Sequence, residues 1–431
     1  MSKNEDNPPP TDPLPGRGGD ALSSEDPGRP RPFAGVRVLD CSQVLAGPYA
    51  GRLLAEMGAD VIKLEAPAGD ATRVIAPKAD RGMSGMYTWA NLGKRNVCID
   101  LRRPEGRELG FRLASWADVI LENFRPGVAE RLGLGWEAVH AANPRCVMLS
   151  ISGFGSDSSL RDRGAYAPTM HAATGLLEYT ARKAKLPVRP LADAYADLTT
   201  AMHAMVGLCA ALRVAERTGV GERVEIAMYD AVLGTYSETC FELFDPSETR
   251  PEPPAYDAGD NGRIAVAGPP QHVWSELRKH FPEEIADPAR PGMELPEKAS
   301  LRHETIERWM CAQASREALL HRLESEANLP CAPVATLHEA LTGPFAQERG
   351  LLLEVDDRLG GTRPVVRLPY RFSRSAVGAE RPAPFRGEHN TEVARELLGL
   401  DDARIRELEA AGVLLVGSPQ DRPERAGVQT S

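Results

Sequence analysis

Short apolar runs alternate with helical patterns along the first third of the chain. Runs of apolar residues bounded by polar ones predict strands, and apolar residues recurring at intervals of three and four predict helices. This alternation predicts a parallel sheet covered by helices. The predicted strands are 36–41, 60–65, 96–101, 118–123 and 146–152, and the predicted helices between them are 49–57, 104–116 and 136–142.

A longer helical pattern follows from Leu198 to Arg217, where most residues are good helix formers with an apolar face. Asp197 lies immediately before this pattern, at the position expected of an N-cap. Two interpretations follow. Asp197 either caps the helix or is a carboxylate nucleophile that the helix dipole keeps ionised. The local sequence does not separate them.

The second half of the chain predicts another, smaller set of elements. A strand at 222–228 and a helix at 229–243 precede a Pro-, Glu- and Gly-rich linker at 245–260. The later elements are a strand at 263–267, helices at 271–280 and 302–324, a strand at 332–337, strand-like residues at 346–386, and helices at 392–398 and 401–412.

These elements predict an α/β protein with a large domain built on a parallel sheet and a smaller α/β domain. Both ends of the chain are poor in large apolar residues and are predicted to be disordered. The predicted organisation is a tail at 1–32, a large domain at 33–228, a helix and linker at 229–260, a small domain at 261–345, a linker with C-terminal helices at 346–417, and a tail at 418–431.

Composition narrows the function. The 431 residues include 51 basic and 61 acidic ones, a net charge of −10 that argues against broad nucleic-acid binding. Seven cysteines without CxxC or zinc-type spacing are typical of a reduced, cytoplasmic protein. We also expect no membrane association, because the sequence has no wholly apolar stretch of about 18 residues and its start lacks a signal-peptide core.

Familiar cofactor motifs are missing from the sequence. Neither GxGxxG after the first strand nor GxxxxGK[ST] occurs, which disfavours a nicotinamide cofactor or a nucleoside triphosphate. The absence of GxSxG disfavours a serine hydrolase. His171 and His203 lie in helical patterns without a paired nucleophile, so we interpret both as structural.

Positive charge gathers around one predicted strand. The pairs Lys94/Arg95 and Arg102/Arg103 flank it, and guanidinium groups suit phosphate. Alternatively, these charged residues lie on a solvent-exposed strand edge and prevent it from pairing with other strands.

A second candidate begins at Asn123, at the carboxyl end of a predicted strand, where ligands bind in such sheets. Phe124 could stack on an adenine ring, and Arg125 or Arg131 could contact phosphate. A proline-stopped turn with a buried Phe is the alternative.

In order and spacing, these motifs resemble CoA-transferase family III, which includes formyl-CoA:oxalate and carnitine CoA-transferases and 2-methylacyl-CoA racemases. The resemblance covers residues 33–243 most closely. It is carried by Val38-Leu-Asp, Ala46-Gly-Pro, Gly58 to Glu65, Lys94-Arg, Asp100-Leu, Pro104-Glu-Gly, Glu122-Asn-Phe-Arg-Pro-Gly, Arg131-Leu-Gly-Leu-Gly-Trp, Asn143-Pro-Arg, Gly153-Phe-Gly, Asp197, Met202-His203 and Thr218-Gly-Val-Gly-Glu.

The resemblance implies two ring-shaped chains interlocked as a homodimer. It also implies that the large domain is Rossmann-like and that the helices within 346–417 return to it. It implies an acyl-CoA substrate, a carboxylic acid acceptor and no permanently bound cofactor. The family's catalytic aspartate falls on Asp197, and Tyr166 is a second catalytic candidate. The family's CoA contacts fall on Ile99, Arg102, Asn123, Phe124 and Arg131, and the residue chemistry adds Lys94 and Arg95 as phosphate candidates.

The resemblance leaves three functions open: CoA transfer, racemisation of a 2-methylacyl-CoA, and CoA binding without turnover. The racemase branch has a His-Asp pair where this chain has Tyr166-Ala167, and racemisation needs two bases, so Tyr166 favours transfer. The chain has Leu45 where formyl-CoA transferases have Gln, and Ala66 where they have a basic residue. Because Leu45 cannot hydrogen-bond an acyl intermediate, we expect substrates other than formate or oxalate.

Overall fold

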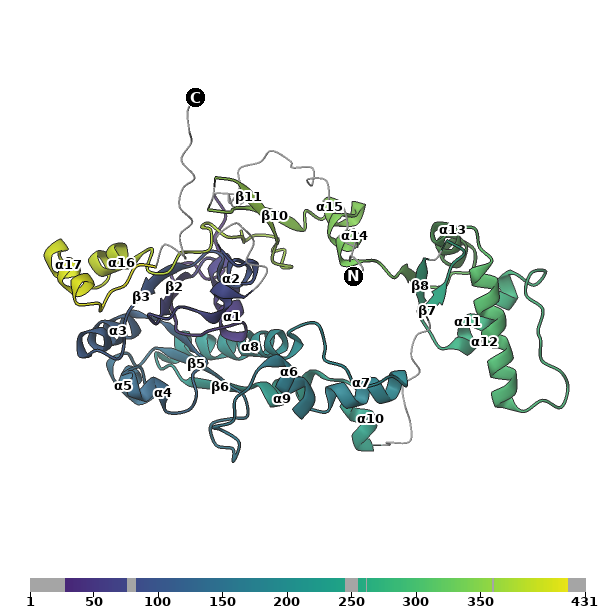
Figure 1. The fold of residues 1–431 in the computed structure, drawn as a ribbon, viewed down its shortest axis with the longest axis horizontal. Helices are drawn as coiled ribbons and strands as arrows, with labels where there is room; N and C mark the ends of the chain where they lie inside the picture. Colours follow the sequence, from purple (N-terminus) through teal and green to yellow (C-terminus); the bar gives the residue numbers. More distant parts are fainter. Residues whose placement is uncertain (1–27, 76–82, 245–254, 261, 359, 418–431) are drawn as a thin grey trace, which may run out of the picture. The chain divides into compact units, whose positions relative to one another are not determined.

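The computed structural model describes residues 28–75, 83–244, 255–260, 262–358 and 360–417. The chain forms two compact units (Figure 1). The first combines residues 1–237 with 350–431, and the second, 238–349, is inserted between them in sequence. The predicted small domain, 261–345, lies inside this second unit. The predicted tail at 418–431 and most of the tail at 1–32 lie outside the described residues.

The first unit is built on a six-stranded parallel sheet in the order β3-β2-β1-β4-β5-β6. Val38 is in register with Val61 on one side and Val119 on the other. The order reverses between β1 and β4, as in Rossmann folds, so the predicted Rossmann-like parallel sheet is confirmed. The strands are β1 (Arg37–Asp40), β2 (Asp60–Glu65), β3 (Arg95–Cys98), β4 (Val119–Glu122), β5 (Val147–Ser152) and β6 (Arg223–Ala227).

Helices fill the connections between these strands. They are α1 (Ala46–Glu56), η1 (Ala71–Val74), α2 (Gly85–Asn91), α3 (Pro104–Trp116), α4 (Val128–Arg131), α5 (Trp136–Ala142), α6 (Ala167–Ala173), α7 (Leu176–Ala184), α8 (Tyr195–Thr218) and α9 (Met228–Thr235). The first unit resumes with the antiparallel pair β10 (Leu352–Asp356) and β11 (Thr362–Val366), followed by α16 (Asn390–Glu396) and α17 (Asp402–Ala410).

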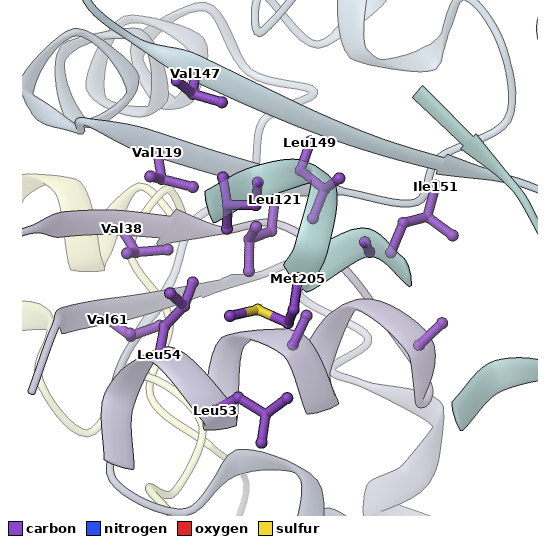
Figure 2. Packing of buried hydrophobic residues seen from close by; sticks show 14 of the residues in the cluster. Val38, Leu53, Leu54, Val61, Val119, Leu121, Val147, Leu149, Ile151 and Met205 are labelled. Carbon is purple, nitrogen blue, oxygen red and sulfur yellow. The ribbon is translucent and has the colours of Figure 1, made fainter. Parts of the chain in front are cut away.

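Alternate residues of each strand face opposite sides of the sheet and separate two apolar cores. Figure 2 shows the first core, in which Val38, Val61 and Val119 lie among side chains of α1 and Met205 of α8. On the other face, Leu39 and Ile62 pack with α3, α5, α16 and α17. Because both faces are covered, the strands β4 and β5 are mostly apolar.

The ends of the described chain complete the first unit. α16 contacts β3, and Leu414 pairs with Ile99 in an isolated antiparallel bridge; Figure 1 shows α16 and α17 beside β3. The prediction that residues 28–32 belong to a disordered tail is wrong. The Arg31 guanidinium donates to the carbonyl oxygen of Glu56 at 2.8 Å and pairs with Glu380. The composition of residues 28–32 does not predict this packing, because polar contacts rather than buried apolar side chains hold the segment in place.

The second unit has its own core, made by α11, α12 and a small antiparallel sheet around Ile264 and Trp309. Its elements are α10 (Thr239–Phe244), β7 (Ala255–Asp257), β8 (Arg263–Val266), α11 (Pro270–His280), α12 (Leu295–Cys311), α13 (Arg316–His321), the π-helical turn η2 (Arg322–Glu326), β9 (Cys331–Pro333), α14 (Leu337–Thr342) and α15 (Pro344–Glu348).

Two helices predicted as continuous are broken. The pattern at 302–324 is divided between α12 and α13 because the Ser315 hydroxyl accepts the N–H of Ala318 and caps a new helix. The carbonyl of Gln313 meanwhile accepts the N–H of Gly259, which bends the chain away from α12. The pattern at 229–243 is likewise divided between α9 and α10.

α8 is long and apolar enough, by length and composition alone, to cross a membrane, a candidate that the sequence interpretation overlooked. The helix packs against α1, α9, β5 and β6. Ala204, Met205 and Leu208 are buried in the first core. The central helix of a packed protein meets the same criterion.

Candidate functional site

Asp197 is the third residue of α8, and its residue surface is 9% exposed. The prediction that it is the N-cap is wrong, because Tyr195 and Ala196 already belong to the helix and Ala194 precedes it. The Asp197 carboxylate therefore lies inside the first turn. It faces the backbone N–H groups of Ala46 and Ala167, the first residues of α1 and α6.

Burial governs the charge of this carboxylate. Loss of solvation raises the pKa of Asp197 from 3.8 to about 6, although the N–H groups of Ala46, Asp197 and Ala167 act in the opposite direction. Backbone donors at helix N-termini favour an anion. Asp197 is thus mostly ionised at neutral pH, yet poorly solvated, as a carboxylate nucleophile requires.

His171 on α6 fixes the start of α8. Its Nε2 accepts the N–H of Ala196 at 3.1 Å, so it satisfies one of the donors that every helix leaves free in its first turn. The ring is buried, and burial lowers the pKa of His171, which keeps this nitrogen available as an acceptor. His203 lies on the same helix as Asp197 and contacts the Thr235 hydroxyl at 2.6 Å.

Tyr166 immediately precedes α6. The Thr169 hydroxyl accepts the N–H of Tyr166 at 3.0 Å, which fixes the entry to the helix. The next N–H in the chain, that of Ala167, is the one that faces Asp197. Tyr166 is 62% exposed. The predicted catalytic role of Tyr166 stays a prediction.

The loop at 42–45 joins β1 to α1, and Asn123 holds it. The N–H of Gln43 donates to Asn123 Oδ1 at 2.8 Å, and Asn123 Nδ2 donates to the Gln43 carbonyl at 2.7 Å. Asn123 follows β4, so this paired exchange ties together the two strand ends where the strand order reverses. The Asn123 amide supports the loop from the protein side.

A pocket of about 190 Å³ opens beside this loop, at the carboxyl ends of β1 to β4. Two of the predicted CoA-contacting residues, Arg102 and Phe124, line it, and so does Ala66. The other lining residues are Cys41, Gln43, Leu64, Pro67, Ala68, Asp100, Leu101 and Leu132. Parallel sheets bind ligands at this edge, so the pocket is the candidate CoA site.

The cations near this pocket differ in accessibility. The Arg102 side chain is 76% exposed and forms a two-point pair with the Asp100 carboxylate, at 2.8 and 2.9 Å. Hydrogen bonding from Arg102 lowers the pKa of Asp100. Arg131 is exposed on α4 and does not line the described pocket. Ile99 is buried in the second core beside the pocket residue Leu101.

Lys94 and Arg95 are not exposed to a phosphate in this structure. Lys94 is fully buried and its ammonium pairs with Asp40 at 2.7 Å. Arg95 pairs with Asp60 at 2.6 Å and with two glutamates of α16. The residues do border β3, but the C-terminal helices cover that edge. Their predicted role as phosphate ligands therefore does not fit the geometry, because carboxylates already occupy both cations.

The sequence interpretation missed the groups that support the loop, namely Asp40, Lys63 and Asp70. A signal was available for Lys63, which is a charged residue inside β2 between the apolar residues Ile62 and Leu64. Charges in such positions are paired when buried. Among the described residues, no three His, Cys, Asp or Glu side chains come close enough to hold a metal ion.

Comparisons with known proteins identify the family of this chain. A model of CoA-transferase family III matches residues 33–390. The succinyl-CoA–L-malate CoA-transferase beta subunit of Chloroflexus aurantiacus is 30% identical over 89% of this chain and 98% of its own length. The formyl-CoA:oxalate CoA-transferase of Streptomyces avermitilis is 33% identical over 88% of this chain and 98% of its own.

Solved structures give the same result. A CaiB/BaiF family protein from Brucella suis superposes with a TM-score of 0.74 at 27% identity, covering 86% of this chain and all of that one. A hypothetical protein from Mycobacterium tuberculosis gives 0.70 at 27% identity, covering 84% of this chain and 99% of its own. Together with the strand order and the buried aspartate, these likenesses show that the chain belongs to CoA-transferase family III.

Proposed function

We propose that this CoA-transferase moves CoA between an acyl-CoA and a free carboxylate through a mixed anhydride on Asp197. The observation that carries the proposal is the Asp197 carboxylate itself. It is buried, it faces backbone donors from two other helices, and it lies in a chain of this family.

The chemistry balances without ATP, metal or redox change. An Asp197 oxygen attacks the thioester carbonyl, the C–S bond breaks, and CoA leaves as the thiolate. The thiolate then attacks the Asp197 carbonyl, releasing the first carboxylate and leaving an aspartyl-CoA thioester. An acceptor carboxylate attacks that thioester to form a second anhydride, and the thiolate attacks its acyl carbonyl, regenerating Asp197.

The donors that face Asp197 have a role in each step. Attack at either carbonyl creates a tetrahedral intermediate with negative charge on oxygen. The N–H groups of Ala46 and Ala167 lie beside the reacting carboxylate and would stabilise that charge as it develops. The pocket lined by Arg102 and Phe124 would bind the CoA moiety.

Substrate choice is proposed from the relatives and from two positions of the site. Relatives named for succinyl-CoA–L-malate and succinate–glutarate transfer act on dicarboxylic acids. Leu45 precedes Ala46, and Ala66 lines the pocket, so both departures from the formyl-CoA transferase pattern fall within the site. We therefore propose a dicarboxylate longer than oxalate, of the size of succinate, malate or glutarate, rather than formate or oxalate.

The proposal includes an interlocked homodimer acting in the cytoplasm. Support comes from apolar side chains that each unit leaves uncovered in the single chain: Met202 and Val206 on α8, and Leu243 and Phe244 at the end of α10, which are 80% and 88% exposed. Light scattering during size-exclusion chromatography would test the dimer, and a monomer at micromolar concentration would refute it.

Trapping with hydroxylamine tests the mechanism. The protein is incubated with succinyl-CoA, glutaryl-CoA or acetyl-CoA, quenched with hydroxylamine, and analysed by peptide mass spectrometry. We expect a hydroxamate at Asp197 with the true donor and none in the Asp197→Asn variant. CoA esters that bind without giving this adduct would refute the proposal. Solvent deuterium entering the α-carbon without CoA exchange would instead indicate a racemase.

A further inference from the structure

Val44 has a φ of 68°, in the left-handed region of the backbone. That region disfavours a β-branched side chain, because its Cβ substituents crowd the backbone. Val44 lies in the middle of the loop at 42–45 that joins β1 to α1. Such a conformation persists only when surrounding contacts hold it, and these positions concentrate at functional sites.

One buried ion pair holds the backbone at Ser42 and at Val44. The Lys63 ammonium lies 3.0 Å from the Asp70 carboxylate, and both side chains are fully buried. Lys63 Nζ also donates to the carbonyl of Ser42 at 2.8 Å. The Asp70 carboxylate accepts the N–H of Val44, with both oxygens at 3.3 Å. The pair thus fixes the backbone two residues before Val44 and at Val44 itself.

A second buried pair supports the same loop from the α1 side. Lys94 Nζ lies 2.7 Å from Asp40 and donates to the carbonyl of Pro48 at 2.8 Å. Asp40 in turn accepts the N–H of Ser42 at 3.0 Å. Although burial opposes ionisation, the charges of Lys94 and Lys63 keep the pKa of Asp40 below its usual value. Both carboxylates therefore act as charged acceptors.

The loop held in this way leads directly to the reacting group. Ala46 follows Val44 by two residues, and its N–H faces the Asp197 carboxylate. Buried ion pairs are weak contributors to stability, since their desolvation offsets their attraction, so four buried charges at one loop indicate another role. We propose that the Lys63–Asp70 and Lys94–Asp40 pairs position the Ala46 N–H for acyl transfer by holding Val44 in its left-handed conformation.

This inference rests on the proposed function for its kinetic consequence, and its structural part can be tested without turnover. The variants are Lys63→Met and the charge-balanced Lys63→Met/Asp70→Asn, each also combined with Val44→Gly. Two quantities are measured: the single-turnover rate of Asp197 acylation, and amide hydrogen exchange of the peptide spanning 42–49 in the protein without ligand. Binding of free CoA is measured alongside.

We expect Lys63→Met and Lys63→Met/Asp70→Asn to slow acylation of Asp197 roughly ten- to a hundredfold. Complete removal of one oxyanion donor typically costs about a hundredfold or more, and these variants displace the Ala46 N–H without removing it. CoA affinity should change less than about threefold, since Asn123 holds Gln43 independently. Exchange in 42–49 should accelerate. Val44→Gly should restore acylation about fivefold or more in the charge variants, because Gly adopts a positive φ without the penalty that Val incurs.

Arg52→Met is the matched control. Arg52 pairs with Glu56 in α1, and both side chains are equally buried, but Arg52 contacts the carbonyls of Trp89 and Val366 instead of the loop. This variant should lose thermal stability while keeping wild-type acylation and exchange at 42–49. A purely structural role for Lys63 would give the same pattern as Arg52.

Each result decides the inference. Folded charge variants with wild-type acylation and exchange would overturn it, and so would slowed variants that Val44→Gly fails to rescue. If Lys63→Met does not fold, the charge-balanced pair supplies the same comparison. If the wild-type protein forms no adduct at Asp197, the proposed function fails, while unchanged exchange in the variants would overturn the positioning role separately.

Discussion

Replacing Asp197 with Asn should remove acylation and at the same time stabilise the protein at neutral pH. Burial raises the pKa of Asp197 from 3.8 to about 6. A shift of about two units means that keeping the group ionised in the folded state costs ~3 kcal/mol at pH 7. Asn carries no charge and escapes this cost. The Asn side chain offers the surrounding N–H groups one acceptor oxygen instead of two. The lost hydrogen-bond acceptor costs about 1 kcal/mol and offsets part of that gain in stability.

The expected net gain is therefore ~2 kcal/mol at pH 7, or a rise in melting temperature of about 4 °C for a domain of this size. The sign depends on pH. A raised pKa means that the folded state binds the proton more tightly, so wild-type stability recovers as pH falls from 6 towards 4. Near pH 4 the charge penalty is only about 0.5 kcal/mol, less than the lost acceptor. The order of the two melting temperatures should then reverse.

Differential scanning fluorimetry of both proteins between pH 4 and pH 7.5 measures this crossover. Asp162→Asn is the control, because the Asp162 side chain is 81% exposed, and it should shift stability by less than about 0.5 kcal/mol at every pH. If Asp197→Asn is no more stable than the wild-type protein at pH 7, burial does not impose the expected cost on the ionised carboxylate. A gain in stability that persists unchanged to pH 4 would lead to the same conclusion.

Three further outcomes follow from the same geometry. The single-turnover acylation rate should fall about tenfold between pH 7 and pH 5, because the nucleophilic form of Asp197 titrates near 6; a flat profile would contradict this. Gly47→Ala should destabilise the folded protein by about 2 kcal/mol and slow acylation, because the added Cβ would lie 2.2 Å from the Cβ of Ser42. A Cβ added at Gly234 in α9 meets nothing within 4 Å, so Gly234→Ala should stabilise the protein by about 1 kcal/mol. Thermal melts of the two variants test both values. Arg102→Gln should weaken CoA binding about tenfold in calorimetry, with the difference shrinking as salt rises, and unchanged affinity would exclude Arg102 from the CoA site.

Local pattern was sufficient to predict the sheet. The strands at 60–65 and 146–152 and the helices at 104–116 and 136–142 follow from apolar spacing, because both faces of a parallel sheet are buried and each helix buries one stripe. The sequence placed Asp197 at the start of α8 but not at its exact position in the first turn. The first residue of a helix depends on which neighbours accept its first N–H groups. Here His171 does so for Ala196, from 25 residues away.

The basic pairs could not be assigned from local sequence. Lys94 and Arg95 look like a solvent-facing phosphate site only when their partners are unknown. Those partners, Asp40, Asp60 and the glutamates of α16, lie 35 to 301 residues away along the chain. Arg102, by contrast, has its partner two residues away, remains exposed and lines the pocket, so its predicted contact with CoA stays open to test. Residues with distant partners are those that sequence reasoning misplaces.

The insertion of residues 238–349 into the first unit sets an order of events during synthesis. β3 leaves the ribosome near residue 98, but α16, α17 and the Leu414 bridge that cover it follow about 300 residues later. Until then Ile99, Leu101 and the cations of β3 lack their cover, and the partially made sheet exposes an apolar face and an open edge. β3 therefore depends on α16, α17 and the Leu414 bridge for its cover, and a nonsense mutation that removes these elements should yield an aggregating chain rather than a weakened enzyme.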